Sequence, residues 1–502
     1  MLASVATFAL EGIESREVTV EVDLRRGLPV FTVVGLPDRT VREARERVRA
    51  ALLNSELEFP LQRLTVNLAP AHLRKAGPSF DLALAVAILA ASGQLAAAEL
   101  DGWAVSGELS LGGVLRPAFG AVAAGARRAG YRRLIVPVEN APEAALVDGI
   151  EVVGVPSLRR LVDLVRGEWE PAPVEPAPPA DPPAFAHDLT DVRGQADARR
   201  ALELAAAGGH NLLMVGPPGV GKTMLARRVP GILPPPTYEE AVEITQVLSV
   251  AGLGSGRLAA RRPFRAPHHT VSASGLVGGG NVPRPGEITL AHRGVLFLDE
   301  LAEFSRNALE ALRQPLESGV AEVMRGQRAI RFPAAAMLVG ACNACPCARR
   351  EGECTCNDAD RARYHRRLSG PLLDRIDLVV ALAPTPLAPV EDGDPGPESS
   401  AAVRARVVAA RERQGQRLSG TGALCNAQMD PRQTRRMILL RGAARDRLAA
   451  ASASGALTAR GHDRVLRLAR TIADLEGSPR VEAVHLDEAL SYRLGAAAPL
   501  AA

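Results

Sequence analysis

The chain has 502 residues, of which 47% are apolar, and its 60 basic and 56 acidic side chains give a net charge of +4. This length predicts about three domains at roughly 100–200 residues each. The balanced charge excludes a strongly acidic solvating chain and a basic tail protein. Only two of the basic residues are lysines, Lys75 and Lys222, so each is a candidate for a specific role.

The start of the chain lacks the features of a secretory signal. Its first residues contain no basic segment and reach Glu11 early. The longest apolar stretch, 82–98, is interrupted by Ser92, Gly93 and Gln94, so it predicts a buried helix rather than a membrane span. We therefore expect a cytoplasmic protein whose six cysteines do not form a disulfide framework.

Seven prolines between residues 171 and 184 predict a semi-rigid spacer. Before it, strand-like runs and helically spaced apolar residues are mixed, which indicates an α+β domain. After it, apolar strands alternate with helical segments, the pattern of a parallel sheet with crossover helices. The predicted multidomain α/β chain comprises an α+β domain (1–168), a proline-rich linker (169–187), a parallel-sheet domain (188–385), a second linker (386–400) and an all-helical domain (401–502).

A phosphate-binding loop follows the apolar run 211–215 and precedes a helical segment. In this strand–loop–helix context the backbone N–H groups of the glycines converge on phosphates, and the helix N-terminus adds its partial positive charge. The Lys222 ammonium is expected to contact the β- and γ-phosphates of ATP, and the Thr223 hydroxyl to serve Mg²⁺. A chance glycine-rich turn is the alternative. The predicted ATP-binding residues of the loop are Gly216, Pro217, Pro218, Gly219, Val220, Gly221, Lys222 and Thr223.

Two acids follow the next strong apolar run, 295–298. Asp299 at the end of such a strand suits Mg²⁺, and Glu300 suits orienting and deprotonating the attacking water. The alternative is that the acids only cap the following helix. The next predicted strand, 335–341, ends near Asn343, whose amide is placed to contact the γ-phosphate or the water.

These motifs together resemble the AAA+ ATPase superfamily, in which Asn343 would be the sensor-1 residue. The resemblance implies that Arg375, in the segment 372–377, is an arginine finger that completes the site of a neighbouring subunit, and therefore that the protein forms an oligomer. An ordinary surface arginine is the alternative. Arg460 resembles the sensor-2 residue that contacts the γ-phosphate in cis, with Arg464 and Arg467 as competitors for that role.

Lys222 and Asp299 are 77 positions apart, which is long for a P-loop core. The additional segments 265–280 and 285–294, and a predicted hairpin at 320–332, resemble the helix-2 insert and the pre-sensor-1 hairpin of the magnesium chelatase and MCM branch of AAA+. In rings of that branch these insertions point into the central pore. The chain beyond the hairpin would end in a helical lid.

The N-terminal part narrows the resemblance to the magnesium chelatase-like ComM/YifB family of bacterial proteins. With the central motifs, the resemblance covers nearly the whole chain. The matching motifs in the two terminal parts are 35–38, 42–48, 66–70, 75–82, 107–113, 137–140, 398–400, 426–427 and 469–477. Membership implies a hexameric, ATP-driven helicase that promotes DNA branch migration in recombination during natural transformation.

The segment around Gly77-Pro-Ser79 also resembles the Lon protease domain and the related ribosomal S5-like fold. In Lon a serine in this context is the nucleophile, and a lysine about forty residues later activates it. That lysine position corresponds to Gly120, and no lysine occurs between residues 76 and 221. We therefore predict that the chain is not a peptidase. Ser79 is expected to cap the helix that starts near Phe80, in a domain for nucleic-acid binding or ring assembly.

A cysteine array lies just beyond Asn343. Four thiolates in two close pairs can hold a tetrahedral Zn²⁺, although the CxC spacing is tighter than the usual CxxC. Reduced thiols in a flexible loop are the alternative. The predicted ligands are Cys345, Cys347, Cys354 and Cys356.

DNA is the expected partner, single-stranded or branched. Residues 401–502 hold 17 arginines against 9 acidic residues, a net +8, which suits salt-dependent phosphate contact. Solvated helix faces would give the same composition. Arg325 and Arg328, at the predicted hairpin tip, are the best candidates for pore contacts with a DNA strand.

A chelatase-like protein-remodelling ATPase that does not act on DNA is the alternative, but chelatase motor subunits lack the N-terminal domain. An ATP-independent scaffold is disfavoured by the intact phosphate loop.

Overall fold

The N-terminal part is built on a seven-stranded mixed sheet in the order β3-β4-β2-β1-β5-β8-β9. Its long hairpin β1–β2 is antiparallel, and alternate β2 side chains, Val18, Val20 and Val22, are fully buried. The strands are β1 (Leu2–Glu11), β2 (Glu14–Arg25), β3 (Val30–Val34), β4 (Arg63–Ala69), β5 (Trp103–Val105), β8 (Arg133–Pro137) and β9 (Glu151–Val155), with a separate pair β6 (Glu108–Leu109) and β7 (Leu115–Arg116).

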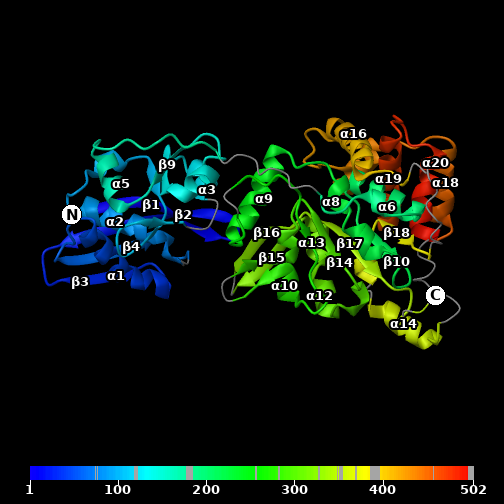
Figure 1. The fold of residues 1–502 in the computed structure, drawn as a ribbon, viewed down its shortest axis with the longest axis horizontal. Helices are drawn as coiled ribbons and strands as arrows, with labels where there is room; N and C mark the ends of the chain where they lie inside the picture. The colour runs from blue at the N-terminus through cyan, green and yellow to red at the C-terminus, as the bar shows by residue number, and fades with distance from the viewer. Residues whose placement is uncertain are drawn as a thin grey trace. The chain divides into compact units, whose positions relative to one another are not determined.

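The computed structural model describes residues 1–73, 75, 77–117, 122–176, 185–254, 257–280, 283–325, 328–347, 349, 354–367, 370–384, 396–455 and 457–495. The chain divides into two units, residues 1–181 with 241–260, and residues 182–240 with 261–502. Figure 1 labels their elements. No helix among these residues is long and apolar enough to cross a membrane.

The helices of the first unit include one that is entirely buried. Every residue of α2 (Asp81–Ala91) is buried, which confirms a buried helix in the first part of the apolar stretch 82–98. Asp81 is also buried and forms an ion pair of 2.7 Å with Arg47 of α1. The other helices are α1 (Arg39–Asn54), α3 (Val122–Arg128), α4 (Ala141–Ala144) and α5 (Leu158–Val165).

Ser79 does not cap this helix, so that prediction is wrong. Pro78 to Phe80 form a 3₁₀ turn, and α2 begins only at Asp81 without any side-chain cap. Proline fixes its own backbone angle and starts the tight turn, which moves the helix start beyond the reach of the serine.

The second unit contains the predicted parallel sheet, in the order β11-β14-β17-β10-β18. All four neighbouring pairs are parallel, so the carboxyl ends of the strands share one edge. The strands are β10 (Leu212–Val215), β11 (Phe264–Arg265), β14 (Val295–Leu298), β17 (Met337–Cys342) and β18 (Leu378–Ala381). Shorter helices connect them: α6 (Ala196–Gly208), α7 (Lys222–Ala226), α8 (Val229–Ile232), α11 (Glu287–Leu290), α12 (Arg306–Ala311), α13 (Arg313–Ser318), α14 (Asp358–Arg367) and α15 (Gly370–Leu373).

Two small insertions interrupt the connections of this sheet. The predicted hairpin is confirmed as β15 (Val320–Arg325) and β16 (Arg328–Pro333), which pair antiparallel. A second pair, β12 (Gly278–Gly279) and β13 (Arg284–Pro285), follows α10 (Ala273–Val277). Arg325 and Arg328 are the last register pair of the larger hairpin. Their side chains and residues 326–327 lie outside the described part of the chain.

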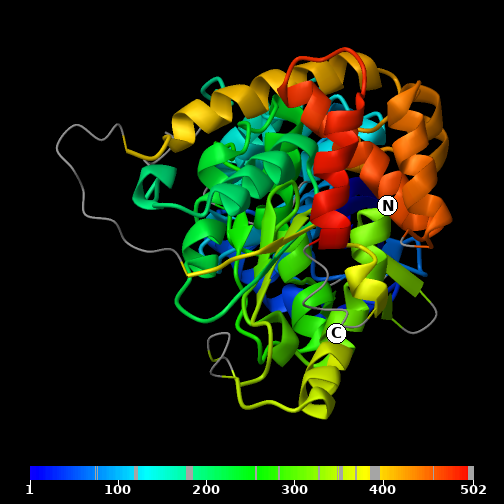
Figure 2. The same cartoon turned by 90° about the vertical axis from the view of Figure 1, so that its right-hand side faces the viewer.

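The C-terminal part is helical, as predicted, but it belongs to the same unit as the parallel sheet. Its helices are α16 (Ser400–Leu418), α17 (Pro431–Met437), α18 (Ala443–Ala453), α19 (Ala459–Leu475) and α20 (Ala483–Leu490). Figure 2 shows these orange and red helices gathered on one side of the unit, where α16 and α19 pack against α6. The ion pair of Arg417 with the buried Asp474, at 2.6 Å, joins α16 to α19.

Residues 241–260 do not follow the predicted domain boundaries. They include most of α9 (Tyr238–Val250) and group with the first unit, although they lie within the expected range of the parallel-sheet domain. The physical reason is an apolar contact in which Ala241 and Leu258 pack with Leu146 of the first unit.

Candidate active site

The phosphate loop connects β10 to α7 at the carboxyl edge of the parallel sheet. Gly219 and Gly221 have φ angles of 78° and 95°, a region that side chains with a Cβ rarely adopt. Gly216 is required for a different reason, since a Cβ there would lie 2.5 Å from the Leu382 carbonyl oxygen. The chain therefore forms a tight loop that ends in the first turn of a helix, as an anion-binding site requires.

Lys222 is buried and fully hydrogen-bonded within this loop. Its Nζ atom donates to the carbonyl oxygens of Gly216 and Pro217, at 2.6 and 2.8 Å, and to Oδ1 of Asn343 at 3.0 Å. Burial lowers the pKa of its ammonium group. These three contacts use all three protons of the ammonium group, at the position where the motif predicts phosphate oxygens.

Thr223 and Asp299 meet at the adjacent position. The Thr223 hydroxyl donates to Oδ2 of Asp299 over 2.7 Å, and Asp299 Oδ1 accepts from the Glu300 N–H over 3.0 Å. A hydroxyl beside a carboxylate next to a phosphate site is the oxygen donor set that Mg²⁺ uses in P-loop enzymes. The structure thus brings together the two residues that the sequence nominates for the metal.

Glu300 has a left-handed backbone, with φ of 51°, a conformation that costs about 1–3 kcal/mol for a residue with a side chain. Its carboxylate is 59% exposed, and Oε2 lies 3.4 Å from Nδ1 of His269. This exposure suits a base that acts on water. Sequence reasoning missed His269. His269 lies in the insert segment 265–280, and the sequence separation from Glu300 does not reveal that the two side chains are close.

Arg375 and Arg460 come together around Glu317 at the end of α13. Arg375 is buried, donates from Nε to the Arg313 carbonyl oxygen over 2.9 Å, and forms an ion pair with Glu317. Arg460 is largely exposed, and its Nη2 atom lies 3.6 Å from Glu317 Oε1. The two predicted ATP-contacting arginines therefore form one cluster.

This cluster does not adjoin the phosphate loop of its own chain. Arg464, one turn beyond Arg460, pairs over 2.6 Å with Asp377, which precedes β18. The phosphate loop follows the carboxyl end of β10, the parallel neighbour of β18. Asp377 and Arg464 therefore lie at the opposite edge of the sheet from the loop. The placement gives no support to the expected cis contact of Arg460. The competitor Arg467 donates to the carbonyls of Ala427 and Met429 and has a structural role.

The four cysteines of the predicted metal site also gather. Their sulfur atoms all lie within 4.8 Å of one another. All six cysteines are free thiols in the structure. Cys342 belongs to β17, as predicted, and Cys425 is buried in the C-terminal part.

The N-terminal unit shows no arrangement for serine–lysine chemistry in its described residues. Lys75 is completely buried, and its ammonium donates to the Pro70 carbonyl. No hydrogen bond joins it to Ser79 there, and Gly120 lies outside the described residues. The absence of a peptidase site stays a prediction.

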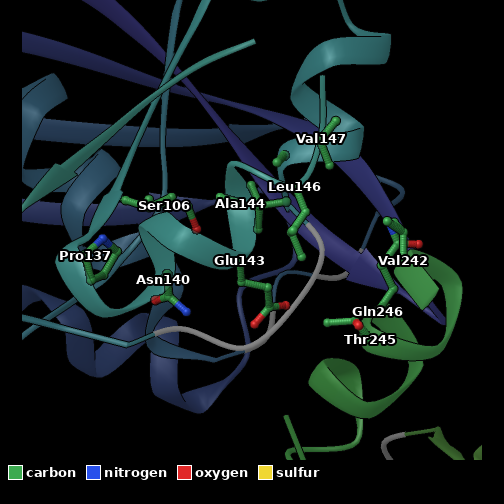
Figure 3. A pocket seen from close by; sticks show the side chains of 13 residues that line it. Ser106, Pro137, Asn140, Glu143, Ala144, Leu146, Val147, Val242, Thr245 and Gln246 are labelled. Atoms are coloured by element: carbon green, nitrogen blue, oxygen red, sulfur yellow. The ribbon is translucent and has the colours of Figure 1, made fainter. Parts of the chain in front are cut away.

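A cavity of about 40 Å³ in the first unit is too small for a nucleotide. Figure 3 shows Glu143 on one side and Thr245 and Gln246 of α9 on the other. Burial raises the pKa of the Glu143 carboxyl, which a hydrogen bond from Ser249 opposes.

Three family models match consecutive parts of the chain. They are the subunit ChlI of Mg-chelatase over residues 20–140, magnesium chelatase subunit ChlI over 188–388, and its C-terminal region over 397–493.

Among relatives, the uncharacterized protein YifB of Escherichia coli is 44% identical over 500 residues, 98% of this chain and 97% of that protein. The competence protein ComM of Haemophilus influenzae is 43% identical over 500 residues, with the same coverage. Lon protease 2 of Bacillus subtilis is 31% identical over 135 residues, 25% of this chain and 24% of that protein. The chain therefore belongs to the ComM/YifB family of magnesium chelatase-like AAA+ proteins.

Proposed function

We propose that this protein is an ATP-driven ring motor that translocates on DNA and promotes branch migration during recombination. The observation that carries the proposal is the meeting of Lys222, Asn343 and the Thr223–Asp299 pair at one edge of a parallel sheet. ATP and Mg²⁺ are its cofactors. Lys222 and the loop amides bind the phosphates, Thr223 and Asp299 hold the metal, and Glu300 activates the attacking water.

The position of the arginine cluster supports a homo-oligomeric ring, and we propose that this ring is a hexamer, as the resemblance to the family implies. Arg375 and Arg460 lie away from the phosphate loop of their own chain, so they would act on ATP bound by a neighbouring subunit. A head-to-tail interface repeated around a ring supplies that arrangement. Arg375 would then stabilise the charge that develops on the transferred phosphoryl group.

DNA as the partner is supported by the hairpin β15–β16 and by the basic C-terminal part. The hairpin begins three residues after Glu317, so the arginine cluster and the hairpin are close neighbours along the chain. Arg325 and Arg328 are the proposed contacts with the DNA backbone. A relative that this chain matches over 97% of its length is named a competence protein, which supports the proposed role in natural transformation. We place this role in the cytoplasm.

A protein-remodelling ATPase that does not act on DNA is the second candidate, favoured by the chelatase-subunit descriptions of the matching families. Steady-state ATP hydrolysis with and without single-stranded, duplex and branched DNA separates the two. We expect DNA to stimulate turnover and Lys222→Ala to abolish it. If no DNA changes the rate of an active enzyme, the protein-remodelling function is favoured. Full turnover by Lys222→Ala would contradict the assigned site itself.

A further inference from the structure

The four thiols beyond β17 have the spacing of a metal-binding tetrahedron. Sγ of Cys345 lies 3.2 Å from that of Cys347 and 3.6 Å from that of Cys354, and the last two sulfurs are 3.6 Å apart. Four sulfurs at about 2.3 Å from a central Zn²⁺ would be about 3.8 Å from one another. A disulfide requires about 2.05 Å. The observed distances therefore match shared coordination of one ion far better than paired oxidation.

The four sulfur ligands and the charge of the neighbouring Arg361 indicate which metal ion the site would bind. Four soft thiolates in a tetrahedron favour zinc over magnesium or calcium, which prefer oxygen ligands. Such a centre carries two net negative charges, and Arg361 donates from Nη2 to Cys354 Sγ over 3.4 Å. A hydrogen bond from a cationic side chain to a ligand sulfur orients the ligand and stabilises the negative charge of the metal site.

The helix that follows the cysteines joins them to the ATP site. Tyr364, one turn beyond Arg361 on α14, is buried and shares a hydrogen bond with the backbone of Asn343. Further along the same helix, Nη1 of Arg367 lies 3.2 Å from Oε2 of Glu303, three residues beyond Glu300. One short helix thus contacts the cysteine cluster, the residue that bonds Lys222, and the segment after the catalytic acids.

We propose that Cys345, Cys347, Cys354 and Cys356 bind one Zn²⁺, and that this ion fixes α14 so that Tyr364 positions Asn343 against Lys222. Asn343 lies only two residues before the first ligand, so the metal constrains the chain on both sides of the contact. Tyr364 is a positioning residue in this account, because it acts through Asn343. The metal site stands independently of the proposed motor activity, whereas its link to Asn343 rests on ATP hydrolysis at Lys222.

Metal analysis of the purified full-length protein tests the site directly. We expect one zinc per chain, six free thiols after denaturation in chelator, and the visible absorption of a tetrahedral thiolate complex when Co²⁺ replaces zinc. The double variant Cys354→Ser/Cys356→Ser should lose the metal, and the control Cys425→Ala should keep it. Iron in place of zinc, or two free thiols with four oxidised cysteines, would overturn the proposal. The wild-type Co²⁺ spectrum decides the matter even if the double variant fails to fold.

Tyr364→Phe tests the link to the ATP site. It should retain one zinc per chain and the KM for ATP, while kcat falls about fivefold, the rate equivalent of one hydrogen bond of ~1 kcal/mol. An unchanged kcat with zinc bound would refute the positioning role and leave the metal site intact. If zinc and hydrolysis behave as expected but DNA has no effect on turnover, the proposed DNA function fails and this inference remains.

Discussion

Oδ1 of Asn343 lies 3.0 Å from Nζ of Lys222, so the end of β17 contacts the phosphate loop through a charged hydrogen bond. β10 and β17 pair in parallel, which brings these two chain segments together at the carboxyl edge of the sheet. In the proposed function, this contact is the one through which Asn343 would respond to phosphate bound at Lys222.

Asn343→Ala should lower kcat by about 10- to 100-fold with a smaller change in the affinity for ATP. A hydrogen bond to a charged group contributes about 1.5–3 kcal/mol, and this one orients the lysine and the water rather than the adenine. Single-turnover hydrolysis and binding of a fluorescent ATP analogue measure the two quantities. Asn54→Ala, which changes an exposed amide of the other unit, is the matched control. A large loss of ATP affinity at unchanged kcat would contradict the assigned role.

Glu300→Gln should bind ATP normally and hydrolyse it at least about 100-fold more slowly, because the amide cannot accept the proton of the attacking water. The variant keeps the shape of the side chain, and the strained backbone at this position is unaffected. Equilibrium binding followed by analysis of the bound nucleotide checks this, with ATP expected to remain intact. Accumulation of ADP at the wild-type rate would show that another group is the base.

Arg375→Ala and Lys222→Ala chains should each be inactive alone and regain turnover when mixed. In a head-to-tail ring, about one interface in four of an equal mixture combines an intact phosphate loop with an intact neighbouring arginine. Arg375 is buried and donates to the Arg313 carbonyl oxygen, so the folding of the Arg375→Ala chain is checked by its thermal unfolding. The ATPase rate of differently tagged, co-purified chains measures the effect. Mixed rings that form but stay inactive would place Arg375 in cis or outside the site.

Asp377→Asn should destabilise the second unit by about 3–5 kcal/mol, because it leaves the Arg464 guanidinium without its buried counter-charge. Burial alone would raise the pKa of the Asp377 carboxyl, but Arg464 and His210 outweigh it and hold the pKa well below its usual range. The carboxylate therefore stabilises the fold above about pH 4, and this contribution is lost as the pH falls further. Urea unfolding at pH 7 and pH 3 checks this. Equal stability loss by the variant at both values would contradict it.

Local sequence patterns predict most of the ATP site. Lys222, Thr223, Asp299, Glu300 and Asn343 each follow a short apolar strand, and parallel strands place their carboxyl ends at one edge whatever the rest of the chain does. The position of Arg460 does not follow from such a pattern, because it depends on how α19 packs against the sheet. The contact of His269 with Glu300 likewise comes from a long connection whose path is set by tertiary packing.

Other differences have equally specific causes. Because Pro78 to Phe80 form a 3₁₀ turn, α2 starts at Asp81, and Ser79 does not cap it as expected. Residues 241–260 group with the first unit because a few apolar side chains contact Leu146, and a helical pattern does not reveal its partner. Of the two lysines, Lys222 lies in the loop that its motif predicts and donates to Asn343, and its contact with phosphate stays a prediction. Lys75 is buried and donates to the Pro70 carbonyl oxygen. Neither the surrounding sequence nor this contact assigns it a chemical role.

Strand exchange on a branched DNA with ATP and Mg²⁺ shows whether the protein drives branch migration. We expect the wild-type protein to move the branch point at a rate that depends on ATP, and Glu300→Gln to bind the same DNA without moving it. The activity should fall as salt rises, because phosphate contacts release counterions. A wild-type protein that hydrolyses ATP but leaves every branched substrate unchanged would contradict the account.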